Sequence, residues 1–552
     1  MKIVIVGGVA GGASVAARAR RLDESAEIIL FERGEYVSYA NCGLPYYIGG
    51  VIEDRDELFL QTPQSLYKRF RIDVRVREEV VSVDKKAHQV KVRKLQTGEE
   101  YTESYDKLVL SPGAEPFVPD GIDASLPGVY TLRSVNDTLK IKELVDGAAG
   151  KKAVVVGGGF IGLEMAENLK AKGVEVTIIE AADQLFPPFD KEMAGMVKHE
   201  FEKNGVKIML NSPIKGVTKE GDAYQVSCTN GTTLSCDFVI LAIGVRPDAH
   251  LAADAGIALN ARGAIVTNET LLTDDPDVYA AGDAIETLNL VSGERVNLPL
   301  AGPANKQGRL IAANITGEEK TEFKGIIGSS VVKIFSQTMA CTGLNEKTLK
   351  RLGTPYEKIY CSPSSHAGYY PGGSQLTIKL LFAPDGKVLG CQIAGTEGVE
   401  KRIDVIATAI KFGATVSDLA ELELCYAPPY SSAKDPVNYA GFIAENALTG
   451  RGPVKHWDML DARDPETSVL LDVRTPGEYA KGALPDSVNI PVDELRERLS
   501  ELPKDKEIWV YCQVGLRGYI GQRILMQSGF DKVYNVSGGY RLMKVCGVLP
   551  QK

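Results

Sequence analysis

A glycine-rich pattern that occurs twice constrains the fold of this chain more than any other feature. The first copy has an apolar strand at residues 3–6, GGVAGG at residues 7–12, the helical pattern ASVAARARRL, and the strand IILFE ending at Glu32. Glycines at such a turn let the backbone approach a pyrophosphate at a helix start, and the acid that follows binds ribose hydroxyls. This copy therefore predicts a dinucleotide-binding βαβ unit, although Val9 replaces its middle glycine.

The second copy of the pattern is complete. It has the strand AVVVG, then Gly157, Gly159 and Gly162 in GGGFIG, the helical pattern LEMAENLKAKG, and the strand VTIIE ending at Glu180. A glycine-rich turn without a ligand is the alternative, but two copies with the same order of elements argue against it. Two dinucleotides imply FAD and a nicotinamide. Because Glu180 has no arginine beside it, we expect it to repel a 2′-phosphate and to favour NADH over NADPH.

Composition limits the function classes that remain. A chain of 552 residues is too long for one core and predicts about three or four domains. The net charge of −9 argues against nucleic-acid and anionic-membrane partners, and no apolar run approaches the length of a bilayer span. The chain enters a strand at once, so we expect no signal peptide and a cytoplasmic location. Nine cysteines without a C-x-x-C pair and five scattered histidines indicate individual thiols and no metal site.

Further segments extend the pattern to most of the chain. KLVLSPGAEP at residues 107–116 and FVILAIGVRPD at residues 238–248 each predict a buried strand turning on a glycine, and TDDPDVYAAGDA puts Gly282 and Asp283 after a short strand. The order of these segments resembles the two-dinucleotide-domain flavoprotein disulfide reductases over residues 1 to about 447. The resemblance implies that Asp283 meets the ribityl chain and phosphate of the flavin.

Strand patterns of a third kind begin near Phe323. VVKIF and LTIKLLF, an expected helix from Lys401 to Phe412, and CYAPPYSSAKDPVNYAGF resemble the interface domain of the same family. The resemblance implies a homodimer in which residues of one subunit reach the active site of the other. An α+β domain of purely structural purpose is the alternative for any single residue here.

A last unit follows a short linker, TGRGP. It alternates strands and helices, among them an expected helix DELRERLSEL, and the order of DVR, GALPDSVNIP and CQVGLR resembles a rhodanese domain. Cys512 ends a buried strand before a helix, so backbone N–H groups, the helix N-terminus and Arg517 are expected to stabilise its thiolate or persulfide. A small apolar cysteine at a strand end is the alternative. The resemblance implies that Cys512 carries sulfane sulfur.

These segments predict an α/β protein with two Rossmann-like domains, an α+β dimerisation domain and a C-terminal α/β rhodanese domain. The expected boundaries are residues 1–115 and 247–322 for the FAD-binding domain, 116–246 for the NADH-binding domain, 323–447 for the dimerisation domain, 448–455 for the linker and 456–552 for the rhodanese domain.

Cys42, in SYANCGLPYY, is the expected redox thiol of the first part of the chain. Family members that close a disulfide within one chain have a second cysteine five residues later, where this chain has Tyr47. The oxidised form of a single thiol is a mixed disulfide with another molecule, a persulfide or a sulfenic acid. Pro45 suits a first helical turn, so we expect helix N–H groups to lower the pKa of Cys42.

The first helix adds two cations beside this thiol. Arg18 and Arg21 are three residues apart and share one helix face, which suits a phosphorylated thiol ligand, with a solvated basic face as the alternative. At this point the resemblance narrows to coenzyme A disulfide reductases and, through the rhodanese unit, to NADH-dependent coenzyme A persulfide and polysulfide reductases. It implies that coenzyme A is bound by six residues, Ser14, Arg18, Arg21, Ser38, Asn41 and Lys434.

The resemblance also assigns catalytic groups. Tyr369 and Tyr426 match paired tyrosines that reach over the cysteine from the other subunit, so the expected catalytic set is Cys42, Cys512, Tyr369, Tyr426 and Arg517. Phe70 occupies a position that is basic in the simpler reductases without a rhodanese domain. The expected cofactor-binding residues are Gly7, Gly8, Ala10, Gly11, Gly12, Glu32, Arg33, Asn41, Ser111, Gly113, Gly157, Gly159, Phe160, Ile161, Gly162, Glu180, Gly244, Gly282, Asp283, Pro299, Ala301 and Tyr426.

Three functions are compatible with this pattern. The first is NADH-driven reduction of coenzyme A persulfide, polysulfide or coenzyme A disulfide at Cys42, with Cys512 relaying sulfane sulfur and hydrogen sulfide released. The second is an NADH oxidase that works through a Cys42 sulfenic acid. The third is a redox sensor without turnover, which two nucleotide motifs argue against. Peroxidases of the wider family need a histidine where this chain has Ala10.

Overall fold

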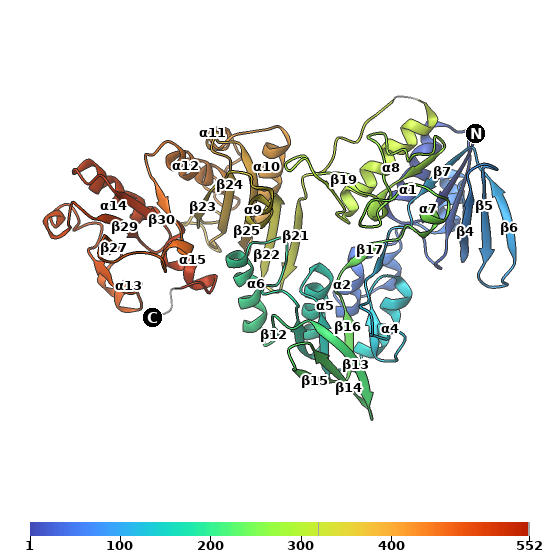
Figure 1. The fold of residues 1–552 in the computed structure, drawn as a ribbon, viewed down its shortest axis with the longest axis horizontal. Coiled ribbons are helices and arrows are strands. Elements are labelled where there is room, and N and C mark those ends of the chain that lie inside the picture. The colour runs from blue at the N-terminus through green and yellow to red at the C-terminus, as the bar shows by residue number, and fades with distance from the viewer. Residues whose placement is uncertain (318–319, 550–552) are drawn as a thin grey trace. The chain divides into compact units, whose positions relative to one another are not determined.

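The computed structural model describes residues 1–317 and 320–549, and Figure 1 traces their course. The chain divides into two units, Met1–Ala182 with Met209–Ile326, and Asp183–Ile208 with Ile327–Lys552. The expected NADH-binding domain of residues 116–246 is therefore interrupted, since Asp183–Ile208 groups with the second unit. The physical reason is a set of buried contacts made by helix α6 (Lys191–Lys203) and the residue before it, described below.

The first unit contains a parallel sheet in the order β18-β7-β1-β2-β3. Its strands are β1 (Lys2–Val6), β2 (Glu27–Glu32), β3 (Asp73–Val76), β7 (Lys107–Leu110) and β18 (Val278–Ala280). Ile3, Val4 and Ile5 have no exposed surface, which is typical of a strand covered on both faces. Helices α1 (Ala10–Leu22) and α8 (Ala301–Thr316) meet so closely that a Cβ on Gly308 would lie 2.5 Å from the carbonyl oxygen of Gly11.

Both glycine motifs have the turn geometry that the sequence predicts. Gly7 and Gly157, the first glycines, have φ of +95° and +107°, which favours glycine. A Cβ on Gly12 would lie 1.9 Å from the carbonyl oxygen of Gly7, and one on Gly162 would lie 2.0 Å from that of Gly157. The last glycine of each motif is therefore needed because the helix packs directly on the preceding turn.

A second parallel sheet has the order β12-β11-β10-β16-β9. Its strands are β9 (Val129–Thr131), β10 (Lys152–Val156), β11 (Glu175–Ile179), β12 (Lys207–Met209) and β16 (Phe238–Leu241), and helix α5 (Phe160–Ala171) follows β10. The two segments predicted to turn on a glycine, residues 107–116 and 238–248, end in an antiparallel pair. It is formed by β8 (Ala114–Pro116) and β17 (Val245–Pro247), directly after Gly113 and Gly244 at φ of +84° and +125°.

Smaller elements complete the first unit. Two antiparallel three-stranded sheets are β4 (Glu78–Asp84), β5 (Gln89–Lys94) and β6 (Glu100–Ser104), and β13 (Ile214–Glu220), β14 (Ala223–Cys228) and β15 (Thr233–Cys236). A short antiparallel pair is β19 (Thr287–Leu288) with β20 (Arg295–Val296). The remaining helices are α2 (Leu44–Gly49), α3 (Pro63–Phe70), α4 (Val135–Val145) and α7 (His250–Asp254), with short 3₁₀ turns η1 (Asn41–Gly43), η2 (Arg55–Leu58) and η3 (Gly282–Ala284).

The second unit begins with an antiparallel sheet in the order β21-β22-β25-β24-β23. Its strands are β21 (Ser330–Ile334), β22 (Gln337–Gly343), β23 (Glu357–Cys361), β24 (Thr377–Phe382) and β25 (Val388–Gly395). The accompanying helices are α9 (Glu346–Leu352), α10 (Val399–Lys411), α11 (Val416–Glu421) and α12 (Pro436–Leu448). The helix expected from Lys401 begins two residues earlier, at Val399, after Gly398 in a left-handed conformation.

The C-terminal part is a parallel sheet in the order β26-β30-β29-β27-β28. Its strands are β26 (Val454–Lys455), β27 (Ser468–Asp472), β28 (Ser487–Asn489), β29 (Glu507–Tyr511) and β30 (Val533–Val536), with helices α13 (Pro476–Ala480), α14 (Leu516–Gln527) and α15 (Gly539–Val545) and 3₁₀ turns η4 (Trp457–Met459) and η5 (Leu499–Glu501). Because β26 pairs with β30, the expected linker of residues 448–455 already contains the first strand of this sheet.

The helix expected at DELRERLSEL is wrong. The segment closes successive tight turns instead, in which the N–H groups of Glu494 and Arg498 bond to carbonyl oxygens three residues earlier, and it ends in η5. Val492 and Leu495 are both buried in the core of this domain. Their close spacing draws the backbone inward at each turn, while the charged residues between them stay outside.

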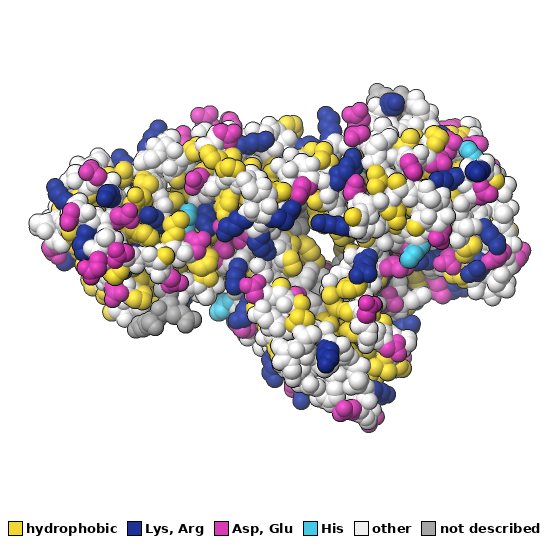
Figure 2. Space-filling view, viewed as in Figure 1, with side chains coloured by type: hydrophobic (Ala, Val, Ile, Leu, Met, Phe, Trp, Pro, Cys, Tyr) yellow, Lys and Arg dark blue, Asp and Glu magenta, His cyan; other side chains and the backbone are white. Residues whose placement is uncertain are grey.

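No helix among the described residues is both long and apolar enough to span a bilayer. On the face drawn in Figure 2, acidic and basic side chains are interspersed over the described residues that are visible. This mixture agrees with the modest net charge of −9 on 552 residues.

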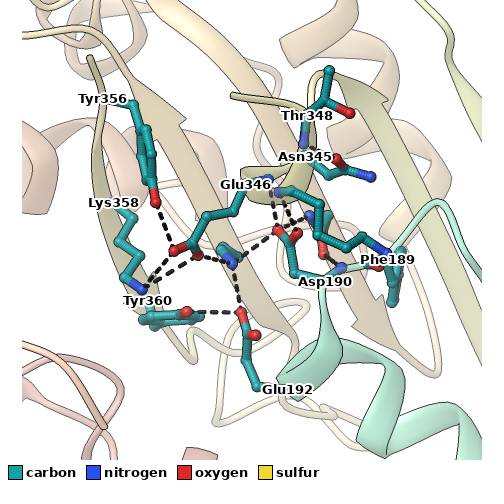
Figure 3. Close-up of polar contacts among 12 residues, drawn as sticks. Phe189, Asp190, Glu192, Asn345, Glu346, Thr348, Tyr356, Lys358 and Tyr360 are labelled. Carbon is teal, nitrogen blue, oxygen red and sulfur yellow. Dashed lines mark hydrogen bonds and ion pairs between the residues drawn. The ribbon is translucent and has the colours of Figure 1, made fainter. Parts of the chain in front are cut away.

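A buried ion cluster joins three segments of the second unit. The ammonium of Lys379 on β24 lies 2.8 Å from Asp190, 2.5 Å from Glu192 and 2.7 Å from Glu346, and its side chain has no exposed surface. Figure 3 shows the three carboxylates converging from the segment around α6 and from α9. Burial opposes the charge of Lys379, but the carboxylates of Glu192, Asp190 and Glu346 outweigh it and raise the pKa of the lysine.

The same cluster reaches the C-terminal sheet. Lys358 on β23 lies 3.1 Å from Glu346 and 2.8 Å from Asp458, which belongs to η4. Tyr360 donates its hydroxyl to Glu192 at 2.7 Å, and its N–H donates to the Ser537 hydroxyl at 2.8 Å. The C-terminal sheet is therefore attached by buried, directional contacts and not only by its chain connection.

Helix packing adds to this attachment. A Cβ on Gly195 of α6 would lie 2.1 Å from the carbonyl oxygen of Cys546, just after α15. The absence of a side chain at Gly195 thus lets α6 and the end of α15 meet at backbone distance.

We predict that Lys379→Met destabilises the second unit. Methionine fills a similar volume but leaves three buried carboxylates without their cation, which costs about 3–5 kcal/mol when one partner of a buried pair is removed. The two tryptophans, Trp457 and Trp509, both lie in the C-terminal domain, so urea unfolding followed by their fluorescence reports on this unit. Lys411→Met, at the exposed end of α10, is the matched control. An unchanged midpoint in Lys379→Met would contradict the prediction.

A pH dependence follows from His456. This side chain is buried beside Tyr360, and burial lowers its pKa to about 3, with Lys358 adding to the effect. In the unfolded chain His456 is protonated below about pH 6.5, whereas in the folded chain it stays neutral down to about pH 3. The free energy of unfolding therefore falls as the pH drops from 6.5 towards 3, by up to about 1.4 kcal/mol per pH unit. His456→Gln should show a shallower loss of unfolding midpoint between these limits, and equal slopes would refute this.

Candidate functional site

The first nucleotide motif opens into a pocket at the ends of the β1 and β7 strands. Eleven of the expected cofactor residues line it, namely Gly7, Gly8, Ala10, Gly11, Glu32, Arg33, Asn41, Ser111, Gly113, Gly282 and Asp283. Gly12 lies behind the turn, where it supports the packing of α1. Pro299 and Ala301 stand just before and at the start of α8 and are not part of this lining.

The acid at the end of each motif is fixed in the same way. Glu32 accepts hydrogen bonds from the N–H groups of Gly8 at 3.0 Å and Gly34 at 2.8 Å. Glu180 accepts them from the N–H groups of Gly158 at 2.6 Å and Ala182 at 2.8 Å. Each carboxylate is therefore held beside its glycine turn, where it can receive ribose hydroxyls.

The residues present fit a flavin dinucleotide in the first pocket. Asn41 lines it with a buried side-chain oxygen that has no partner among the described residues, so a bound ligand could supply the missing donor. Burial raises the pKa of Asp283, and Arg133 partly opposes this effect. These groups would hold the ribityl and pyrophosphate parts of FAD, while helix α1 begins directly at the glycine turn.

Several pocket residues were missed by the sequence motifs. Tyr36, Tyr39, Arg133 and Ser134 line the same pocket, and a neighbouring cavity beside Glu32 is lined by residues 78–81 of β4. No spacing in the sequence indicates them, because they come from loops and from a strand outside the βαβ unit. Arg133 is fixed by donating to the carbonyl oxygen of Ala114 at 2.6 Å.

The second motif leaves open space at its middle glycine. A Cβ on Gly159, the N-cap of α5, would meet no atom within 4 Å, which fits a site that a pyrophosphate approaches closely. Phe160 and Ile161 form the first turn of α5, and both are partly exposed. Gly244 lies after β16 with open space around it. These residues and Glu180 would hold NADH.

Cys42 is an exposed free thiol in the 3₁₀ turn η1, directly before α2. The expected lowering of its pKa is wrong for the protein groups alone: loss of hydration raises the pKa, and the charges of Glu164 and Asp283 raise it further. The reason is that α2 has only six residues and that the nearest charged groups are acidic. Sequence reasoning missed Glu164, whose place next to Cys42 depends on how α2 packs on α5.

Tyr47 occupies the position of the second cysteine and is buried. The ammonium of Lys142 on α4 lies 5.5 Å from the centre of its ring. The chain thus has a buried aromatic ring at the position where a second cysteine would stand.

The expected coenzyme A residues divide between the two units. In the first unit, the Ser14 hydroxyl donates to Asn305 at 2.6 Å, and the Arg21 guanidinium lies 6.0 Å from the centre of the Phe70 ring. The Phe70 ring therefore lies beside a cation. Ser38 has φ of +50°, and its N–H donates to the carbonyl oxygen of Gly8. In the second unit, Lys434 is exposed.

The structure brings Tyr369 and Tyr426 together. Their hydroxyls lie 2.6 Å apart, and the residues are 75% and 46% exposed. The hydrogen bond to Tyr426 raises the pKa of Tyr369. Large aromatic side chains this exposed fit a surface that acts on another molecule or subunit. Their expected place over Cys42 of another subunit stays a prediction.

Cys512 is fully buried between β29 and α14. The N–H of Gly515 donates to its sulfur at 3.1 Å, so the loop directs one backbone donor at this atom. The loop is held from behind, since the N–H groups of Tyr540 and Arg541 donate to the carbonyl oxygens of Cys512 and Gln513, both at 2.9 Å.

Arg517 interacts electrostatically with Cys512 and also has an acidic partner that the sequence did not indicate. It lies in the first turn of α14 and makes two hydrogen bonds of 2.7 Å to the carboxylate of Glu478, whose pKa it lowers to about 2. Its charge is thus shared with Glu478, which sequence reasoning missed. Arg474 lies 2.6 Å from Asp472 and donates a hydrogen bond of 3.3 Å to the side chain of Gln513, so it contacts the loop that follows Cys512.

Family models match three parts of the chain. Residues 1–308 match the pyridine nucleotide-disulphide oxidoreductase model, residues 329–436 match the dimerisation domain of that family, and residues 453–544 match the rhodanese-like domain.

Curated relatives cover the part before the rhodanese-like domain. A coenzyme A disulfide reductase of Staphylococcus epidermidis is 36% identical over 445 residues, which are 80% of this chain and 100% of the relative. An NADH oxidase of Methanocaldococcus jannaschii is 36% identical over 451 residues, 81% of this chain and 99% of the relative.

Solved structures cover nearly the whole chain. Reduced Bacillus anthracis CoADR-RHD has a TM-score of 0.96 and 49% identity, covering 99% of this chain and 98% of that one. An NAD-dependent persulfide reductase from A. fulgidus has a TM-score of 0.92 and 38% identity, covering 98% and 100%. These matches confirm the resemblance that the motifs indicated: the chain belongs to the pyridine nucleotide-disulphide oxidoreductase family and carries a C-terminal rhodanese-like domain.

Proposed function

We propose that this protein uses NADH to reduce coenzyme A persulfide, polysulfide or coenzyme A disulfide at Cys42 and releases hydrogen sulfide from the sulfur-rich substrates. The observation that carries the proposal is one exposed thiol before α2, with the buried Tyr47 in place of a second cysteine. Such a thiol completes its disulfide only with another molecule. Relatives named coenzyme A disulfide reductase and persulfide reductase support this choice of sulfur substrate.

When bound, NADH would supply a hydride, which carries two electrons, and FAD would accept it. The chain holds FAD through the residues around the first glycine turn and NADH through those around the second. The Cys42 thiolate attacks the outer sulfur of a persulfide or one sulfur of a disulfide, and the rest of the substrate leaves as a thiolate as its sulfur–sulfur bond breaks. Two electrons and two protons then cleave the new sulfur–sulfur bond, which restores Cys42 and releases hydrogen sulfide or a thiol. The reducing environment that such thiol chemistry needs agrees with the expected cytoplasmic location.

Coenzyme A binding is proposed at Ser14, Arg18, Arg21, Ser38 and Asn41, with Lys434 supplied by a second subunit of a homodimer. The guanidinium groups on α1 suit the phosphates of this ligand. Tyr426, and with it Tyr369, would donate a hydrogen bond to the leaving sulfur, since their hydroxyls are already paired at 2.6 Å.

Cys512 is proposed to accept sulfane sulfur from polysulfide or another donor and to pass it to coenzyme A. The N–H of Gly515 would stabilise the negative charge of a terminal persulfide, and the ion pair of Arg517 with Glu478 connects α14 to α13. The pantetheine arm of coenzyme A then carries the sulfur to Cys42.

NADH oxidation by oxygen through a Cys42 sulfenic acid is the second candidate. The 36% identity to an NADH oxidase favours it, but that relative aligns with only 81% of this chain. The 98% coverage by a persulfide reductase that includes the C-terminal domain favours the sulfur reaction. Oxygen uptake equal to NADH loss, without sulfide, would identify the oxidase.

Variants of the two thiols test the proposed reaction. Under anaerobic conditions, Cys42→Ser should turn over coenzyme A persulfide at less than about one hundredth of the wild-type rate, because serine is a far weaker nucleophile. Cys512→Ser should keep this activity but lose sulfide release from inorganic polysulfide supplied with catalytic coenzyme A. Sulfide release and NADH oxidation are both followed. Normal turnover by Cys42→Ser would end the proposal.

Glu180 tests the choice of nicotinamide. Glu180→Gln removes the negative charge that would meet a 2′-phosphate but keeps an oxygen that accepts from Gly158 or Ala182. We expect the ratio of kcat/KM for NADPH to that for NADH to rise about tenfold, equivalent to about 1.4 kcal/mol. Glu175→Gln, at the exposed start of the strand β11 that Glu180 follows, is the control. A ratio that does not move in Glu180→Gln would assign the preference to other residues.

A further inference from the structure

Tyr46 and Glu164 meet beside Cys42. Tyr46 lies four residues after Cys42, within the short helix α2. Helix α2 packs on α5 so closely that a Cβ on Gly49 would lie 1.9 Å from the side-chain oxygen of Asn168. This packing brings the Tyr46 hydroxyl to Glu164, to which it donates a hydrogen bond of 3.1 Å. A carboxyl group and a hydroxyl to which the motifs gave no role thus interact electrostatically with Cys42.

The surroundings of Glu164 favour its neutral form. Burial raises its pKa to about 7, the Tyr46 hydroxyl partly opposes this, and the neighbouring carboxylate of Glu167 on α5 adds to it. Helix α4, which packs on α2, carries Lys142, and this lysine forms an ion pair with Asp146 at 2.7 Å. Near neutral pH this carboxyl group can therefore take up or release a proton, as a catalytic acid or base must.

Glu164 and Cys42 influence each other directly. Negative charge on Glu164 raises the pKa of Cys42, and Asp283 on η3 acts in the same direction. Burial raises the pKa of Tyr46, and Glu164 and Cys42 raise it further. Like charges at this range titrate as a pair, so a thiolate at Cys42 is favoured when Glu164 carries the proton.

We propose that Glu164, whose carboxyl group accepts the hydrogen bond of the Tyr46 hydroxyl, holds the proton that Cys42 gives up, so that Cys42 and Glu164 carry a single negative charge in turn. This inference rests on the proposed role of Cys42 as the attacking thiol. Glu164 and Tyr46 act on the substrate through Cys42 and are positioning residues.

The proton balance of the attack on a persulfide is complete with these groups. The Cys42 thiol passes its proton to the Glu164 carboxylate, and the thiolate attacks the outer sulfur of the persulfide. A sulfur–sulfur bond forms to Cys42 while the one in the substrate breaks, and the departing thiolate takes the proton back from Glu164. A thiol and a persulfide thus become a persulfide and a thiol, with no net oxidation or reduction.

The test measures the thiol without any sulfur substrate. Reduced, FAD-loaded protein is alkylated with iodoacetamide across pH 5.5–9.5, and the rate at Cys42 is read by peptide mass spectrometry. Wild type should show an inflection near pH 7 from Glu164. Glu164→Gln should lose this inflection and react about tenfold faster at pH 7 if the pKa of Cys42 falls by about one unit. Tyr46→Phe should move it to higher pH, because the hydroxyl that favours the carboxylate is gone.

In Glu164→Gln, the turnover rate should change in the opposite direction to the alkylation rate. A merely structural change would not produce opposite effects. Glu164→Gln should reduce coenzyme A persulfide more slowly than wild type even though more of its Cys42 is thiolate, because the returning proton is missing. Glu143→Gln, an exposed carboxyl on α4, is the matched control and should change neither readout. Flavin absorbance and the unfolding midpoint confirm that each variant is folded, and Tyr46→Phe serves where Glu164→Gln does not fold.

An alkylation profile that is the same in wild type, Glu164→Gln and Tyr46→Phe would overturn the inference. A change in KM for NADH alone, with the Cys42 profile unchanged, would also overturn it and would assign Glu164 to the nicotinamide. Since alkylation needs no substrate, this result is independent of the proposed function, which fails separately if Cys42→Ser retains turnover.

Discussion

The second unit depends on one buried ammonium group. Lys379 comes from the middle of an antiparallel sheet and meets carboxylates from the α6 segment and from α9. Apolar contacts would tolerate small shifts between these segments, whereas a buried charge without its partner is strongly unfavourable. The cluster therefore fixes the register of α6 against the sheet. Through Lys358 and Asp458 it extends the same constraint to the C-terminal domain.

Much of the fold could be predicted because its signals are local. Each glycine motif fixes a turn, a helix start and an acid, and both motifs have the predicted geometry. The signals that failed were of another kind. DELRERLSEL has helical composition, but Val492 and Leu495 turn its backbone into the core. The interruption at Asp183–Ile208 depends on contacts with residues that lie far away in the sequence, such as Glu192 with Lys379.

The chemistry of the thiols was less predictable than their positions. Cys42 and Cys512 stand at the expected turns, yet charged groups around them come from other elements. Glu164 reaches Cys42 because α2 packs on α5, and Glu478 takes up the charge of Arg517 across from α13. A motif shows which residues are adjacent in the sequence, whereas a pKa depends on which residues are close in space.

The early start of β26 has a consequence for how sulfur travels. Helix α12 ends at Leu448 and β26 begins at Val454, so only residues 449–453 connect the dimerisation and rhodanese-like domains, and both ends of this connection are anchored. Lipoyl-type carriers move their cargo on a mobile protein arm. With so short a tether, this chain has no such arm at this junction, so in the proposed relay the reach has to come from the ligand, whose length then selects the acceptor.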